Sequence, residues 1–580
     1  MPRIPTLHQL AVPALLSLAV AAPMLIGPPA AEGTAADAGA SHAVRRAATP
    51  RPNVVFVLAD DLGWSDLSEG RTNLGHPNDF NETPAIDRLA REGVSFDNAY
   101  ACLNCAPTRA ALMSGVYAPR EQNNIYAVDS LNRGGDDTLL VGPRQGDATG
   151  DDALPASTQT VAETMDAAGY STGYIGKFHV THTVADITSV HGWGENWGGS
   201  PSANATAYHA SNGTFNNSIA PSLDKYAQPY TQDYVEQNIA PYSHGVSKAR
   251  LDALVGTDKQ VSDAVGDATL DFIDRQSSKP FFAWMSEYAV HAPVDEGQAR
   301  SDLLAKYQAK KPGTSRSTPS YAALTEGLDQ TVGRLVRHLK TTPDPRNPGH
   351  ALADNTLVLF ASDNGGRTDF GADNGPLKGQ KAELDEGGVR VPYIAWSANP
   401  RLVRGRRIVS STINATDLYP TVADLGHASL PRGVPFDGTS LRTLIARGGT
   451  LHRPRFQHMP GYVIKDGQDQ RPQSSVRDGR WKLLYSYETQ GWELYDLRSD
   501  LGETRNLASA RPRVVRRLGS ELIRWLDATN PPLAALRAGR APLHLTVRGT
   551  TYSGGSLHRY RGQTLTIEPG DEVPLVLQDR

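Results

Sequence analysis

Two apolar segments of strand length lie far apart in the chain, and they constrain the possible fold more than any other feature of the sequence. Residues 54–59 and 356–361 are nearly continuous runs of Val, Leu, Phe and Ala. Such strands are buried on both faces, as in parallel sheets covered by helices. Further patterns alternate around them; the predicted strands are 174–175 and 280–285, and the predicted helices are 160–168, 261–273 and 321–339. The sequence therefore predicts an α/β fold with a large mixed, mostly parallel sheet sandwiched by helices.

The character of the sequence changes after residue 441. Gly448, Gly449 and Pro454 punctuate the chain, and short strand-like pieces follow at 481–485 and 492–495. An amphipathic helix comes next, with its apolar stripe formed by Val514, Val515, Leu518, Leu522, Trp525 and Leu526. We therefore predict a large domain over residues 52–441 and a smaller α+β domain over 442–580.

The N-terminus has the pattern of a secretory signal. Arg3 and His8 precede an apolar run over residues 10–26, which Pro13 and Pro23 interrupt, and small residues follow. The uninterrupted apolar stretch is shorter than the roughly 20 residues that span a bilayer, which argues against the alternative of a membrane anchor. We predict a signal peptide and leader over 1–40, a linker over 41–51, a secreted or periplasmic protein, and no membrane span after signal removal.

Charge and cysteine content exclude two classes of protein. The net charge is −4 and the Lys and Arg residues are dispersed, so we expect no nucleic-acid partner. Two cysteines in 580 residues cannot form a disulfide framework. Cys102 and Cys105 have the spacing of a redox dithiol or half a zinc site, but the chain has no second Cys pair. A local disulfide between them stays open.

The second of these cysteines begins the segment Cys105-Ala106-Pro107-Thr108-Arg109. Pro suits the first turn of a helix, so we predict a short helix that ends at Gly115. Cys105 then lies at the positive end of the helix dipole, and Arg109 returns to the same face one turn later. A nucleophile beside a fixed cation suits the hydrolysis of anionic esters. The alternative is an ordinary buried cysteine.

Polar oxygen-bearing residues follow both apolar segments. Asp60 and Asp61 come after the first, and Asp363 and Asn364 follow the second. Because the carboxyl ends of parallel strands meet at the crevice where such folds bind ligands, these side chains are expected to converge. An all-oxygen set suits Ca²⁺ or Mg²⁺ rather than zinc.

Together these motifs resemble the type I sulfatases of the alkaline-phosphatase-like superfamily, over roughly residues 52–507. Three other segments contribute to the resemblance: Gly176-Lys177-Phe178-His179, His291-Ala292-Pro293, and the segment around Lys381. The chain departs from the family pattern at Phe178, where Trp is usual, and at Thr108, where Ser is frequent. The resemblance implies a sulfuric ester hydrolase with an alkaline-phosphatase-like fold.

The resemblance also implies roles for single residues. Cys105 would be oxidised to formylglycine by a formylglycine-generating enzyme, and its hydrate would attack sulfur. A Ca²⁺ ion, or alternatively Mg²⁺, would be held by Asp60, Asp61, Asp363, Asn364 and the modified residue 105. Arg109, Lys177 and Lys381 would neutralise the sulfate oxygens, with His291 as general acid and His179 as base for regeneration of the aldehyde.

The substrate is the least constrained part of the prediction. His458 is expected near the substrate, because carbohydrate sulfatases often have a His there. The irregular segments 121–154 and 191–244 are read as walls of the cleft, or alternatively as surface insertions. We therefore expect a sulfated saccharide or another small sulfate ester. The alternatives are a formylglycine-dependent phosphonate or phosphate ester hydrolase, and a carbohydrate-binding homologue without catalysis.

Overall fold

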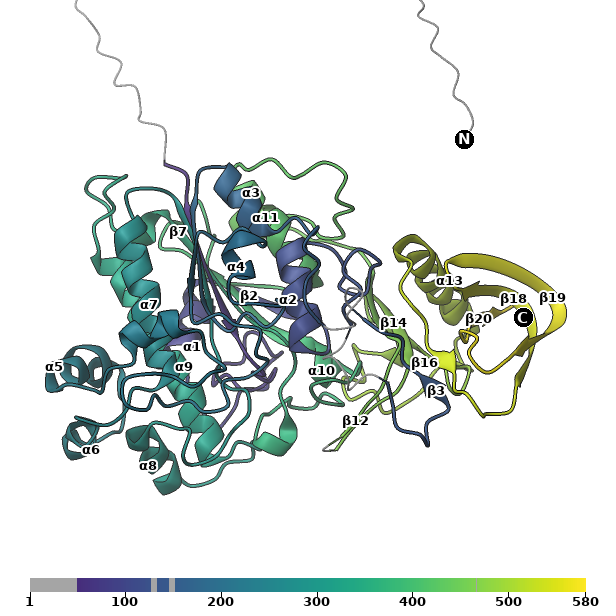
Figure 1. The fold of residues 1–580 in the computed structure, drawn as a ribbon, viewed down its shortest axis with the longest axis horizontal. Coiled ribbons are helices and arrows are strands. Elements are labelled where there is room, and N and C mark those ends of the chain that lie inside the picture. The colour runs from purple at the N-terminus through teal and green to yellow at the C-terminus, as the bar shows by residue number, and fades with distance from the viewer. Residues whose placement is uncertain (1–49, 127–132, 146–151, 466, 580) are drawn as a thin grey trace, which may run out of the picture. The chain divides into compact units, whose positions relative to one another are not determined.

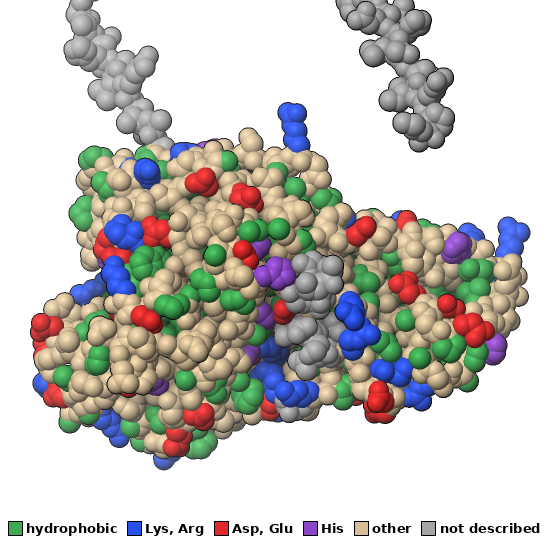
Figure 2. Space-filling view, in the orientation of Figure 1, with side chains coloured by type: hydrophobic (Ala, Val, Ile, Leu, Met, Phe, Trp, Pro, Cys, Tyr) green, Lys and Arg blue, Asp and Glu red, His purple; other side chains and the backbone are tan. Residues whose placement is uncertain are grey.

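A computed structural model describes residues 50–126, 133–145, 152–465 and 467–579 (Figure 1). The predicted signal peptide at 1–40 lies outside these ranges, as does the predicted linker apart from residues 50 and 51. In the part of the chain that is described, no helix is long and apolar enough to cross a membrane. On the face seen in Figure 2, acidic and basic side chains are interspersed.

A nine-stranded sheet forms the centre of the fold over residues 53–414. The strand β1 (Asn53–Ala59) lies between β6 (Phe281–Ser286) and β7 (Thr356–Ser362) and is parallel to both. The sheet continues on one side with β4 and β5, and on the other with β8, β2, β9 and β10. Their bounds are β2 Val94–Tyr100, β4 Ser171–Gly176, β5 Glu195–Trp197, β8 Arg390–Trp396, β9 Arg407–Val409 and β10 Ile413–Asn414. Only β8 runs antiparallel to its neighbours, so the predicted mixed, mostly parallel sheet is confirmed.

Helices cover both faces of this sheet, as the alternation along β1 requires. Val55 and Val57 pack on one side, and Val54, Phe56 and Leu58 pack on the other. The first face is covered by α1 (Pro84–Glu92), α7 (Val261–Gln276) and α9 (Pro319–Thr341). The second is covered by α2 (Cys105–Ser114), α3 (Val161–Ala167) and α11 (Leu418–Leu425) (Figure 1).

Capping residues fix the first turn of two of the predicted helices. Thr160 caps α3 in a capping box with Glu163, and the Thr318 side chain accepts from the backbone of Tyr321 at the start of α9. The shorter elements are α4 Asp186–Ser189, α5 Gln232–Tyr234, α6 Lys248–Asp252, α8 Ser301–Ala309, α10 Glu386–Val389, α12 Arg442–Arg447, β3 Leu140–Val141, β12 Val463–Lys465, β13 Gln468–Gln470 and β17 Ala535–Leu536.

The C-terminal part combines antiparallel sheets with one long helix. A four-stranded sheet has the order β11-β14-β15-β16, and a three-stranded sheet has the order β19-β18-β20. The helix α13 (Pro512–Thr529) contacts both, and its apolar stripe packs in their common core. The strand bounds are β11 Arg455–Met459, β14 Gln473–Asp478, β15 Trp481–Ser486, β16 Gly491–Asp496, β18 Leu543–Ser553, β19 Ser556–Ile567 and β20 Leu575–Gln578.

The core can be followed across the predicted boundary at residue 442, which stays a prediction. Leu444 and Ile445 of α12 belong to the core of the large sheet. The antiparallel part therefore begins at β11. The described part of the irregular segment 121–154 also joins it, since β3 pairs with β17.

A buried carboxyl group at the end of β6 is expected to make the stability of the fold depend on pH. Glu287 follows β6 and is fully buried. Burial raises the pKa of its carboxyl to about 8, because Ser262 and Arg334 offset only part of the desolvation and Asp263 adds repulsion. Between the unfolded pKa of about 4.3 and this value the folded state binds more protons, so the free energy of unfolding falls as pH rises.

We therefore expect Glu287→Gln to raise the melting temperature by several degrees at about pH 8 and by much less at about pH 5. Thermal unfolding at the two pH values measures this difference. Glu296→Gln, at an exposed position, serves as control. Its melting temperature should depend on pH as that of the wild type does. An equal change at both pH values would contradict the prediction.

Candidate active site

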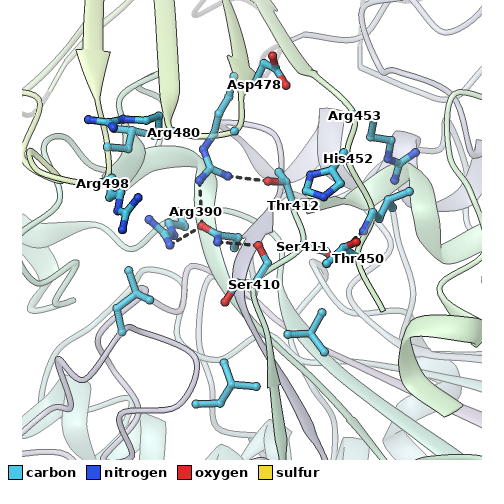
Figure 3. A pocket seen from close by; sticks show the side chains of 18 of the residues that line it. Arg390, Ser410, Ser411, Thr412, Thr450, His452, Arg453, Asp478, Arg480 and Arg498 are labelled. Carbon is cyan, nitrogen blue, oxygen red and sulfur yellow. Dashed lines mark hydrogen bonds between the residues drawn. The ribbon is translucent and has the colours of Figure 1, made fainter. Parts of the chain in front are cut away.

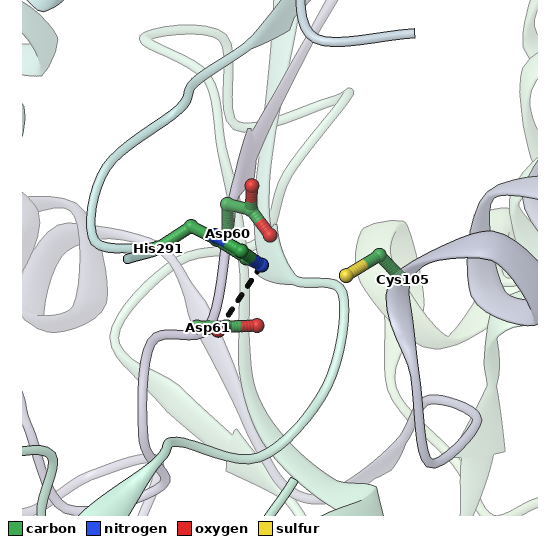
Figure 4. Close-up of side chains that lie close together, drawn as sticks. All are labelled: Asp60, Asp61, Cys105 and His291. Carbon is green, nitrogen blue, oxygen red and sulfur yellow. Dashed lines mark ion pairs between the residues drawn. The ribbon is translucent and has the colours of Figure 1, made fainter. Parts of the chain in front are cut away.

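The polar residues that follow β1 and β7 meet at the carboxyl edge of the sheet. The parallel register pairs Ala59 with Ser362, so the residues after each strand emerge side by side. Ligand atoms of Asp60, Asp61, Cys105 and His291 all lie within 4.8 Å of one another (Figure 4). Together with residues 363–364, which follow β7, the structure brings residues 60–61, 105 and 291 to one place from four distant segments.

The acidic residues form an oxygen-rich pocket with unused acceptors. The Asn364 amide nitrogen donates to Asp61 Oδ1 over 2.7 Å, and the Asp61 backbone N–H donates to Asp363 Oδ1 over 3.2 Å. Asp60 Oδ1 and Asn364 Oδ1 are buried and have no hydrogen-bond partner among the described residues. Burial raises the pKa of Asp60, and the nearby charge of Asp363 adds to this effect. Orphaned oxygens among buried carboxylates fit a hard divalent cation.

Cys105 is the first residue of α2 and is 1% exposed. Burial opposes ionisation of its thiol, but Lys177, Lys381 and hydrogen bonds from His179 and His291 together hold its pKa well below the ordinary value. Cys102 shows the contrast, because burial raises the pKa of its thiol to about 12. Both cysteines are free thiols, so the disulfide left open by the sequence is absent from the structure.

Two lysines reach the site from different sides. The Lys177 ammonium lies 2.5 Å from Asp60 Oδ2, and the Lys381 ammonium lies 2.7 Å from Asp61 Oδ1. Lys177 is placed by the turn at Gly176, which has φ +97° and where a Cβ atom would lie 1.8 Å from the backbone oxygen of Ser286. Only glycine fits this turn without strain.

Arg109 is fully buried and is already engaged by protein groups. Its Nε and Nη2 donate to Asp363 Oδ2 over 3.1 and 2.9 Å. Its Nη1 donates to the backbone oxygen of Lys177 over 2.6 Å and to Ser286 Oγ over 2.7 Å. The resemblance implied a contact between Arg109 and the sulfate. In this structure these donors are directed to protein groups, and the contact of Arg109 with the sulfate stays a prediction.

Hydrogen bonds place the ring proton on different nitrogens of the two histidines. His291 Nδ1 lies 2.8 Å from the backbone oxygen of Ala292, which can only accept, so Nδ1 carries a proton and Nε2 faces Asp61 at 3.7 Å. His179 Nε2 lies 3.0 Å from a carboxylate oxygen of Asp152, which leaves Nδ1 as the free ring atom. The Cys105 thiol is close enough to both rings to affect their pKa values.

His458 does not join this group. It lies on β11, is 2% exposed, and has both ring nitrogens in hydrogen bonds, Nδ1 with Ser474 Oγ and Nε2 with the backbone oxygen of Pro532. Burial lowers its pKa to about 4. The expected substrate contact of His458 is therefore not supported, because the ring is used for packing inside the C-terminal part.

Several residues of the site were not predicted from the sequence. Asp152 holds His179 and comes from an irregular stretch without a motif. The Tyr208 hydroxyl donates to the backbone oxygens of Tyr288 and His291 over 2.5 and 2.7 Å, which ties the segment 191–244 to the loop that carries His291. Side chains that act through long-range contacts leave no local signal in the sequence.

The comparisons with known proteins agree with this geometry. The family described as Sulfatase matches residues 52–428. A protein named Sulfatase from Formosa agariphila is 35% identical over 524 residues, which cover 85% of this chain and 92% of that protein. The human N-acetylgalactosamine-6-sulfatase is 30% identical over 417 residues, covering 70% of this chain and 68% of that protein.

Solved structures show the same fold. Ps i-CgsB in complex with k-i-k-neocarrahexaose superposes with a TM-score of 0.60 at 25% identity, covering 83% of this chain and 94% of that chain. The central sheet, the C-terminal antiparallel sheets and the matched family region agree with the sequence-based prediction. The chain therefore belongs to the sulfatase family of the alkaline-phosphatase-like superfamily and is a sulfatase.

Proposed function

We propose that this sulfatase removes sulfate from a sulfated carbohydrate, with a formylglycine made from Cys105 and one divalent cation, Ca²⁺ or alternatively Mg²⁺. The observation that carries the proposal is the position of Cys105. It begins α2 within 4.8 Å of Asp60, Asp61 and His291 ligand atoms. Two lysines pair with those carboxylates, so an anionic ester would meet fixed positive charge beside the nucleophile.

Asp60, Asp61, Asp363 and Asn364 would hold the cation together with residue 105. The cation would polarise the sulfate oxygens and favour ionisation of the nucleophile. The buried, unpartnered oxygens of Asp60 and Asn364 support this assignment. The carboxylates favour a hard cation such as Ca²⁺ or Mg²⁺.

Formylglycine would supply a hydrated aldehyde, whose one hydroxyl attacks sulfur and whose other allows sulfate to leave as the aldehyde is restored. Lys177 and Lys381 would orient and neutralise the sulfate. His291 would give a proton to the leaving oxygen from Nε2, because Nδ1 is held by the Ala292 carbonyl. His179 would accept a proton at Nδ1, because Asp152 occupies Nε2.

The carbohydrate substrate is proposed from two sources. The relatives include an N-acetylgalactosamine-6-sulfatase, and one structural neighbour was solved with a neocarrahexaose. The predicted signal peptide would bring the enzyme to an extracytoplasmic compartment, where polymeric saccharides are accessible. The modification also requires a formylglycine-generating enzyme as a partner during maturation.

The test compares ester classes on one enzyme preparation in which maturation has been verified. We expect release of sulfate from an aryl sulfate and from a sulfated sugar, with kcat/KM well above that for an aryl phosphonate or phosphodiester. A panel of sulfated monosaccharides would then identify the sugar and the position of the sulfate. A preference for the phosphorus esters would contradict the proposal and favour the alternative hydrolase.

Asp152 gives a further prediction for this reaction. Asp152→Asn keeps the shape of the side chain but removes the charge that orients His179 and stabilises its protonated form. We expect kcat on a sulfate ester to fall by about tenfold or more, with a small change in KM, because a partner that fixes a catalytic histidine acts on the chemical step.

The matched control is Asp258→Asn, at an exposed position away from the site. It should keep the wild-type kcat. Asp152→Glu restores the charge and should recover part of the loss if orientation of His179 is the cause. Equal kcat values for Asp152→Asn and the wild type would remove Asp152 from the mechanism.

A further inference from the structure

A cavity of about 790 Å³ lies at the outer edge of the large sheet, beside the C-terminal sheet. Its walls include the segment after β9, the turn between β14 and β15, and the segment after β16. In Figure 3, Arg390, Arg480 and Arg498 approach the hollow from one side, and His452 and Arg453 from the other. None of the catalytic candidates lines it, and strands β8 and β2 separate β9 from β7.

Three of the six arginines that line this cavity are neutralised by carboxylates. Arg480 forms an ion pair with Asp496, and Arg453 forms one with Asp417. Arg390 Nη1 lies 3.5 Å from Glu386 Oε2. The charges of these three arginines are therefore balanced by carboxylates of the protein.

The other three form no ion pair with a carboxylate in the described part of the chain, although Arg477 interacts electrostatically with Glu386 and Asp97. Arg477 donates to Thr412 Oγ1 and Asn98 Oδ1 over 2.9 and 3.0 Å, and its Nε is buried without a partner. Arg407 donates only to backbone oxygens, those of Arg404, Leu444 and Ile445. Arg498 is exposed, and its guanidinium has no partner among the described residues.

The cavity offers almost no negative charge to balance these three groups. Asp478 is its only acidic lining residue, and it accepts from Arg517 over 2.5 Å. Hydroxyl groups complete the wall, among them those of Ser410, Thr412 and Thr450. A concave site with unpaired guanidinium groups and hydroxyls is suited to oxyanions on a polar ligand, because arginine forms directed, paired hydrogen bonds with such groups.

We infer that this cavity binds an anionic saccharide, with its sulfate or carboxylate groups at Arg407, Arg477 and Arg498. The volume falls in the range of roughly 300–1,000 Å³ that is typical of small-molecule sites, and is far larger than one inorganic anion requires. The saccharide part of this inference rests on the proposed function; the oxyanion part rests on the arginines alone. The site would hold a part of the sugar chain that is not being hydrolysed, or a separate anionic saccharide.

The test is isothermal titration of the mature, full-length enzyme with a sulfated κ-carrageenan hexasaccharide. The neutral agarose-derived hexasaccharide and inorganic sulfate are titrated in parallel. Arg498→Glu is the main variant, because the side chain is exposed and makes no contact that folding needs. Arg477→Gln is the second variant. The matched control is Arg524→Glu on α13, where the side chain is exposed and has no partner among the described residues.

We expect Arg498→Glu and Arg477→Gln each to weaken binding of the sulfated hexasaccharide at one site per chain by about tenfold or more. Arg524→Glu should match the wild type, binding should weaken with ionic strength, and kcat/KM for a small aryl sulfate should be unchanged in all three variants. The neutral hexasaccharide should not bind this site, and inorganic sulfate should bind it much more weakly.

Unchanged affinity in both cavity variants, or no binding to the wild type, would overturn the inference. Inorganic sulfate that binds as tightly as the hexasaccharide would overturn its saccharide part. An enzyme that binds the hexasaccharide through these arginines but hydrolyses no sulfate ester would support the inference and contradict the proposed function.

Discussion

Cys105→Ala is expected to lower kcat on sulfate esters by at least about 10⁴-fold, the scale on which removal of a covalent nucleophile acts. The variant should keep its fold, because Ala fills most of the buried space and the other residues of the site are held by their own contacts. Steady-state kinetics with an aryl sulfate and circular dichroism of the purified variant measure the two effects.

The chain supplies its own matched control. Cys102→Ala removes the other buried thiol, three residues away, and should keep most of the activity at a small cost in stability. Mass spectrometry of the tryptic peptide 92–109 of the wild type should show conversion of a thiol to an aldehyde at Cys105. An unmodified Cys105 in fully active enzyme would contradict the proposed nucleophile.

Removal of divalent cations is expected to abolish activity and to lower the melting temperature by several degrees. Asp60, Asp61 and Asp363 are buried together, each beside one cationic side chain, and the pKa of Asp60 is raised by burial. Asp60 Oδ1 and Asn364 Oδ1 still have no hydrogen-bond partner among the described residues, so a bound cation would satisfy them. A cation at about 100 times its Kd stabilises the folded state by about 2.7 kcal/mol. Dialysis against a chelator, then titration of Ca²⁺ or Mg²⁺ during thermal unfolding, measures the effect.

The variant Asp61→Asn tests the same site by removing one proposed ligand of the cation. It should lose activity, and its melting temperature should respond little to either cation. Asp97→Asn, a buried carboxyl outside the site, should keep the cation response of the wild type. An active enzyme after complete chelation would contradict a catalytic role for the cation.

Elements defined by local sequence could be predicted closely. The buried strands β1 and β7, the helices α7 and α9, and the short helix that begins at Cys105 follow from runs, periodicity and capping residues. The antiparallel strand β8 was not predicted, because its place depends on pairing with β2 and β7 rather than on its own residues.

The residues of the site also differ in whether local sequence identifies them. Asp60, Asp61 and Cys105 could be identified because each follows a local element in a recognisable motif, and the structure brings them together. The engagement of Arg109 by Asp363 and the use of both His458 ring nitrogens depend on partners far along the chain. Whether a polar side chain is free or already satisfied is a property of the folded structure, so the sequence pattern alone could not distinguish them.

The burial of α2 sets an order of events in the biogenesis of this protein. All ten residues of the helix are buried, with Cys105 and Arg109 at 1% and 0% exposure. If Cys105 is modified as proposed, an enzyme that recognises Cys105, Pro107 and Arg109 would have to meet the chain before these residues are buried. Maturation and folding would then compete in time, and folded protein isolated without that enzyme should resist later conversion until it is unfolded.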